Sequence, residues 1–225
     1  MDEPTWDRLA AGTGLLFVAL VIIAGLVAGA FPGLNDQPEA IARFFQDERS
    51  AVQLSTVLWA FGSLALLWFA GSVRHHLAMA EGGTARLAVV AFGFGVAAVS
   101  IIVVTLAVTS GLAYSIARRS DPTVTAAIFE LRHMFQVFTP YFLAGFIGAA
   151  SLAAWRSGAL PQGLSGAGLV IAVLLLVSGL APVFEGSSLA PGKIYGDLVF
   201  YAFLAWVVVA SITMMQRLAT PRAPM

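Results

Sequence analysis

The chain of 225 residues contains no cysteine, a single lysine and three histidines. Without cysteine it cannot form disulfide bonds, thiolate nucleophiles or cysteine-ligated metal centres. Charged residues make up only 11% of the sequence, less than half of the roughly 25% that is usual in soluble domains. The 12 basic and 12 acidic residues give a net charge of zero, so the sequence does not predict binding to nucleic acid.

Apolar residues are present in excess. They form 59% of the chain, which is more than a soluble protein of this length can hide in one core. They gather into six stretches, each near the roughly 20 residues that a helix needs to cross a bilayer. These spans are Leu9–Phe31, Val52–Val73, Leu87–Thr109, Met134–Trp155, Gly166–Phe184 and Ile194–Met214. Because backbone groups in lipid must pair within a helix or a closed barrel, the sequence predicts an all-α, polytopic transmembrane bundle of six helices. It forms a single domain over residues 1–225, and the lipid bilayer surrounds it.

The longest link between spans, residues 32–50, contains a helix of a different kind. Pro38 suits the first turn of a helix, and Glu39 is favourable near its positive end. Ile41, Phe44 and Phe45 share one face. We expect a short amphipathic interfacial helix that lies on the membrane surface or packs over the mouth of the bundle. A lid over a binding site is the alternative.

Two spans are expected to continue beyond the bilayer. Only scattered glycines interrupt residues 87–117, and Asp121 followed by Pro122 is a good start for a helix that can run to Trp155. Such helices would be about 45–50 Å long, whereas the hydrocarbon core is about 30 Å thick. We therefore expect a hairpin that protrudes on one side of the membrane or tilts strongly.

Small residues recur at four-residue spacing, which lets helix backbones approach closely in lipid. The pairs are Gly25 and Gly29, Gly93 and Ala97, Ala144 and Gly148, and Gly145 and Ala149. We interpret them as packing positions within the bundle. Contact with a second copy of the chain, or with another membrane protein, is the alternative.

Ionisable residues near the membrane are candidates for function because their burial is costly. The candidate polar cluster comprises Glu130, Arg132, His133, Glu185 and Asp197, all on the side away from the termini. Glu130 and His133 share a helix face, but helical di-iron bundles need two such motifs and further glutamates. No metal site and no catalytic set is therefore predicted, and the cofactor is left open. The cluster can bind a polar ligand or relay protons; alternatively, these charges simply gather where water is.

Several segments resemble a known group of proteins. Trp68–Arg74, Ala80–Leu87 and Gly158–Pro161, together with the helix around Ile41–Phe45, resemble uncharacterised six-span integral membrane proteins of high-GC bacteria. The resemblance covers nearly the whole chain and implies a small helical membrane protein. It implies no established activity and carries over no catalytic or binding residue.

The basic residues of the chain indicate its origin but not its orientation. Arginine outnumbers lysine eleven to one, a bias typical of GC-rich codons, so we expect a bacterial plasma (inner) membrane. An even number of spans places both termini on one side. Each side carries six basic residues, so the positive-inside rule does not decide which side this is; the cytoplasmic side is preferred.

No recognisable chemistry emerges from these patterns. We interpret the chain as a non-enzymatic structural or accessory subunit, or as a small-ligand binder. A small transporter or channel is one alternative. The other is an integral membrane enzyme that acts on a lipid or isoprenoid, with Glu130 and Asp197 as acid and base and His133 as their partner.

Overall fold

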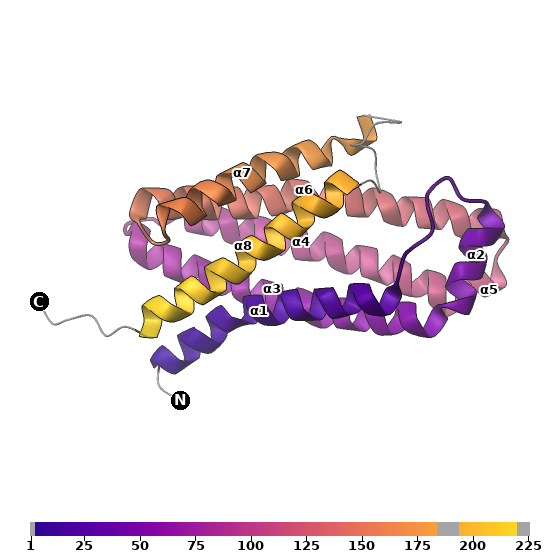
Figure 1. Cartoon of the computed structure of the whole chain (residues 1–225), viewed down its shortest axis with the longest axis horizontal. Coiled ribbons are helices and arrows are strands. Elements are labelled where there is room, and N and C mark those ends of the chain that lie inside the picture. The colour runs from indigo at the N-terminus through magenta and orange to yellow at the C-terminus, as the bar shows by residue number, and fades with distance from the viewer. Residues whose placement is uncertain (1–2, 184–193, 220–225) are drawn as a thin grey trace, which may run out of the picture.

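The computed structural model describes residues 3–183 and 194–219, and every regular element in these ranges is helical. Six long helices lie side by side along the bundle (Figure 1). They are α1 (Glu3–Ala28), α3 (Arg49–Glu81), α4 (Arg86–Gly111), α6 (Pro122–Ser157), α7 (Gln162–Gly179) and α8 (Ile194–Ala219). The short elements are α2 (Pro38–Asp47), a π-helical turn η1 (Leu112–Ile116), α5 (Ala117–Arg119) and a 3-10 turn η2 (Ala181–Val183).

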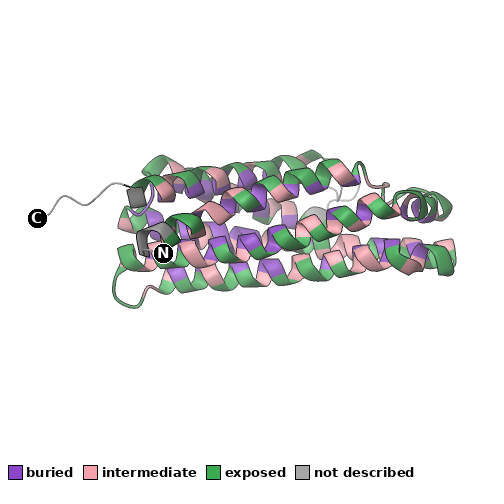
Figure 2. Ribbon diagram, turned by 90° about the horizontal axis from the view of Figure 1, so that it is seen from below, coloured by how far each residue is buried: buried purple, intermediate pink, exposed green. Residues whose placement is uncertain are grey.

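All six long helices are long and apolar enough to cross a membrane. Apolar side chains remain exposed over the outside of the bundle, and Leu26 on α1 is 79% exposed. Figure 2 shows exposed residues along the outer faces of the long helices. A soluble monomer rarely exposes an apolar surface of this extent to water, whereas such a surface is suited to contact with lipid. The prediction of an all-α, six-span transmembrane bundle is confirmed.

The long helices differ in length, and this produces a protruding end. The helix formed by α4, η1 and α5 has 34 residues and α6 has 36, or about 51 and 54 Å. α3, with 33 residues, is nearly as long. These three helices extend past the end of α1 towards α2 (Figure 1). The expected hairpin of α4 and α6 is therefore present, and α3 extends beside it as a third long helix.

Local sequence explains where the helices begin and end. Asp121 Oδ1 accepts a hydrogen bond from the backbone N–H of Thr123 (2.8 Å), and Pro122 opens α6, as expected. Gly82 and Gly158, at the ends of α3 and α6, adopt φ angles of 65° and 70°, which glycine tolerates. Gly29, directly after α1, likewise has a positive φ angle of 65°. This helix therefore ends at Ala28, whereas the sequence predicts a span that continues to Phe31.

Two apolar cores stabilise the described residues. The larger fills the bundle and includes the buried rings of Phe17, Phe69, Phe146 and Phe203. The smaller lies in the protruding end, beneath α2. Its buried members are Ile41, Phe45, Val52, Leu112, Ala113, Ala117 and Phe129. We call α2 together with this smaller core the cap.

The cap settles the role of the amphipathic face of α2. Ile41 and Phe45 are fully buried and Phe44 is half-buried, so their shared face packs on protein. The Phe45 ring meets the Phe129 ring edge to face, with centroids 5.6 Å apart. α2 therefore packs over the end of the bundle, which was the second of the two placements expected for it.

The small residues divide into two groups. An added Cβ at Gly145 would lie 2.5 Å from the Phe94 ring, and at Gly148 it would lie 3.3 Å from Ala172. These two glycines therefore sit at helix contacts, as interpreted. At Gly25 and Gly93 an added Cβ would meet no atom within 4 Å. Their spacing is the same, but they face outwards from the described bundle.

Candidate functional site

None of the described members of the predicted polar cluster lines either of the two hollows found at the other end of the bundle. Glu130 on α6 and Asp197 in the first turn of α8 are exposed, whereas Arg132 and His133 are half-buried. Glu185 lies outside the described residues. Among the cluster members that are described, no hydrogen bond or ion pair joins one to another. What the structure brings together is Arg132 and a set of residues from other elements.

Arg132 holds three segments in place. Its Nε donates a hydrogen bond to Thr109 Oγ1 on α4 (3.0 Å). Its guanidinium carbon lies 4.7 Å from the centre of the Phe31 ring and 5.8 Å from that of Phe129. Phe31 belongs to the link between α1 and α2, so this cation–π contact ties the link to α6. No carboxylate pairs with Arg132 within residues 3–183 and 194–219.

A second polar contact lies next to the first. Gln53 on α3 donates from Nε2 to the backbone carbonyl of Ser110 (2.8 Å), and the Ser110 hydroxyl donates back to Gln53 Oε1 (3.0 Å). Ser110 directly follows Thr109, so both contacts are made from one turn of α4. Together they link α3, α4 and α6 at the base of the cap, where α1 has already ended. We call these residues (Gln53, Thr109, Ser110, Arg132) the polar belt.

The backbone of α4 changes just beyond the polar belt. Leu112–Ile116 form a π-helical turn, and Gln46 of α2 donates from Nε2 to the carbonyl of Ala117 (2.5 Å). A π-turn widens the helix and disturbs its carbonyl ladder, and it occurs often at functional sites. Here the carbonyl next to the turn, that of Ala117, accepts a hydrogen bond from the Gln46 side chain and so links α2 to the end of the α4 helix.

His133 is placed differently from Arg132. Its Nε2 atom is buried, and the described residues provide no hydrogen-bond partner for it. No group of three or more His, Asp or Glu side chains with metal-binding geometry occurs in the described part of the chain. Within these residues, the cluster therefore offers a single half-buried imidazole with a buried Nε2 atom, and no set of ligands.

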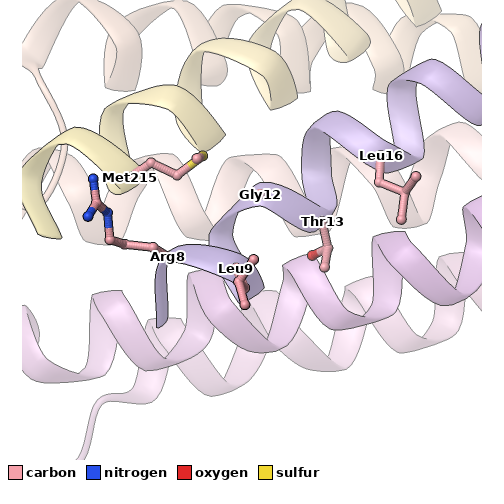
Figure 3. Close-up of a pocket in the computed structure, with 6 residues that line it drawn as sticks. All are labelled: Arg8, Leu9, Gly12, Thr13, Leu16 and Met215. Atoms are coloured by element: carbon pink, nitrogen blue, oxygen red, sulfur yellow. The ribbon is translucent and has the colours of Figure 1, made fainter. Parts of the chain in front are cut away.

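Two open hollows lie at the opposite end of the bundle, where α1 begins and α8 ends. One, of about 400 Å³, is formed by α1 and α8 and is mainly apolar. Figure 3 shows its lining residues: Arg8, Leu9, Gly12, Thr13, Leu16 and Met215. The other, of about 550 Å³, is polar and lies between the α3–α4 turn and the end of α6. Sequence reasoning found neither hollow, because α1 and α8 lie at opposite ends of the sequence, and the α3–α4 turn meets Arg156 and Ser157 only in the folded bundle.

Comparison of the chain with models of protein families, with curated proteins and with solved structures finds no match.

Proposed function

We propose that the chain is a non-enzymatic structural or accessory subunit of a membrane assembly. The observation that carries this proposal is the chemistry of the interior. In the described residues, every buried side chain of the polar and charged residue types is a serine or a threonine. Transport paths and membrane active sites usually contain ionisable groups in a water-filled interior.

Most of these buried hydroxyls are already used by their own helices. Ser63 donates to the Trp59 carbonyl (2.9 Å), and Thr105 donates to that of Ile101 (2.9 Å). Such bonds satisfy the hydroxyl without a water molecule or a ligand. The half-buried charge of Arg132 is likewise engaged with Thr109 and two phenylalanine rings. This is the interior of a packed helical scaffold.

The location and family of the chain belong to the same proposal. The preference for arginine over lysine, eleven to one, supports a bacterial inner membrane. An even number of spans places both termini on one side, and we take this side to be the cytoplasm. The segments Trp68–Arg74, Ala80–Leu87 and Gly158–Pro161 support membership of the six-span group of high-GC bacteria that they resemble.

Two measurements test this function. Proteoliposomes that contain the purified chain should be as impermeable to protons and potassium ions as empty liposomes. Flux above that background, reduced by Glu130→Gln or Asp197→Asn, would favour a transporter. Turnover of a lipid by the purified monomer would favour an enzyme.

The positive test is photo-crosslinking within the native membrane. A crosslinking residue is placed at Leu26 on α1 or at Val173 on α7, which are 79% and 59% exposed and lie on different helices. An accessory subunit should give one discrete protein adduct at one of these positions and lipid adducts at the other. Lipid adducts alone at both would contradict a stable partner on either face.

A further inference from the structure

The polar hollow at the end of the bundle where α1 begins is open on one side and is lined mainly by polar groups. Its volume is about 550 Å³, within the roughly 300–1,000 Å³ that is usual for small-molecule sites. Side chains of Glu81, Thr84, Arg86, Arg156 and Ser157 contribute to its lining. Arg86 begins α4 and Arg156 lies in the last turn of α6, so two separate helices each provide one guanidinium group.

These two arginines are free for a ligand, unlike others at the same end. Arg217 donates to the carbonyls of Gly158 (2.9 Å) and Ala159 (2.5 Å), and Arg74 lies over the ring of Phe92. Arg86 and Arg156 form no ion pair or hydrogen bond with any residue that the structure describes. Their positive charge therefore remains available in the hollow.

The one carboxylate in the lining is already engaged. Glu81 Oε2 accepts a hydrogen bond from the backbone N–H of Ala88 (2.9 Å), which holds the carboxylate at the start of α4. Two arginines and one glutamate leave the hollow with a surplus of positive charge. Such a lining favours an anion.

The residues that flank the hollow indicate that it lies near the depth of the lipid headgroups. Arg86 directly precedes Leu87, where the apolar run of α4 starts, and Arg156 directly follows Trp155. Trp155 is 48% exposed, and exposed tryptophans mark the membrane–water interface. A site at this depth meets phospholipid phosphates on one side and water on the other.

We propose that this hollow binds a phosphate-bearing anion, the chemistry shared by a phospholipid headgroup and by free phosphate. Arg86 and Arg156 donate charge-assisted hydrogen bonds to the phosphate oxygens, and the Thr84 hydroxyl is a further donor within the lining. Basic pockets between transmembrane helices bind anionic headgroups in the same way. This binding does not depend on the proposed function.

The test is native mass spectrometry of the full chain in an uncharged detergent. Phosphatidylglycerol is titrated in parallel with phosphatidylcholine that carries the same acyl chains. In the double variant Arg86→Gln/Arg156→Gln, the affinity for phosphatidylglycerol should fall about tenfold or more, because each lost charge-assisted bond contributes substantially. The matched control, Arg118→Gln/Arg119→Gln, removes the same charge at the other end of the bundle and should leave the affinity within about twofold.

A second arm distinguishes the source of the phosphate. Millimolar inorganic phosphate that binds the wild type but not the double variant, without any preference for phosphatidylglycerol, would support a soluble anion at the same site. Retained binding of phosphatidylglycerol by the double variant, with no effect of inorganic phosphate, would overturn the proposal. If the double variant does not fold, the single variants Arg86→Gln and Arg156→Gln should each weaken binding by about threefold or more; unchanged binding in both would also overturn it.

Discussion

At the residue scale, Arg132 connects the cap to the bundle. A lysine at this position would keep the charge but lose both the planar stacking on Phe31 and the Nε–H that Thr109 accepts. We expect Arg132→Lys to lower the free energy of opening of the cap by about 1–2 kcal/mol. Hydrogen exchange in residues 38–47 measures this.

The control for Arg132→Lys is Arg118→Lys. Arg118 is exposed, and it donates only to the Tyr114 carbonyl of its own helix (2.8 Å). Its replacement should leave exchange in α2 unchanged. Equal exchange in Arg132→Lys and the wild type would show that the cation–π contact does not hold the cap.

Gly168 lies at a close approach of α7 to the bundle. An added Cβ at Gly168 would lie 1.9 Å from Ser151 Oγ and 2.7 Å from Trp206 Nε1, and both of these side chains are buried. We expect Gly168→Ala to lower the free energy of unfolding by about 1–3 kcal/mol because the contact becomes overpacked. Thermal unfolding in detergent measures the loss. Gly163→Ala is the control on the same helix, since its Cβ would meet no atom within 4 Å; a similar Tm for the two variants would argue against this close contact.

At the element scale, α2 is held by a core of its own. Phe45 is fully buried between the rings of Phe31, Phe44 and Phe129, and none of these belongs to the larger core. We expect Phe45→Ala to destabilise the cap by about 3–5 kcal/mol while the six long helices stay folded.

Limited proteolysis between Gly29 and Gln37, read together with hydrogen exchange, reports the state of the cap. Cleavage should become faster in Phe45→Ala but not in the control Arg43→Ala, which alters an exposed residue of α2. Simultaneous loss of protection in α2 and α7 would show instead that the cap and the bundle unfold as one unit.

The stability of the start of α6 should decrease at acidic pH. The backbone N–H of Thr123 donates to the Asp121 carboxylate and lowers its pKa. The stabilisation is therefore complete above the ordinary carboxyl pKa and is lost as the pH falls through the lowered pKa of the folded state. Asp121→Asn cannot titrate, so its Tm should fall less than that of the wild type on acidification. Asp47→Asn, on an exposed residue of α2, is the control; equal slopes for Asp121→Asn and the wild type would contradict this cap.

The sequence predicts best those features that depend only on residues within one helix. Asp121 and Pro122 predict the start of α6, and the spacing of Ile41 and Phe45 predicts the buried face of α2, because capping and periodicity are local properties. The partners of Arg132 are not local: Phe31 and Thr109 lie 101 and 23 residues away. No pattern near Arg132 predicts that pairing.

The small residues show the same limit. Gly25 and Gly145 both stand four residues before another small residue, but only Gly145 lies under a ring of a neighbouring helix. The spacing places both small residues on one helix face, and the arrangement of helices decides what that face meets. The sequence predicts that all five candidate site residues lie on one side of the membrane. It does not predict which of their side chains point into the bundle.

At the scale of the whole molecule, its two ends differ. One end carries the cap and the polar belt, which hold three long helices together past the end of α1. The other end carries the start of α1 and the end of α8 (Figure 1). The two hollows lie at this end, and Figure 3 shows the one between α1 and α8. An apolar outer surface separates them. This arrangement requires the two ends to face different aqueous compartments.

Cysteine labelling tests this claim most directly, since any introduced thiol is the only one in the chain. Single cysteines replace four exposed residues: Asn35 and Ser120 at the cap end, and Thr84 and Gln162 at the other end. If the termini lie in the cytoplasm, as proposed, a membrane-impermeant maleimide should label the first pair in intact cells and the second pair only after permeabilisation. Labelling of all four positions in intact cells would contradict a bundle of six membrane-spanning helices.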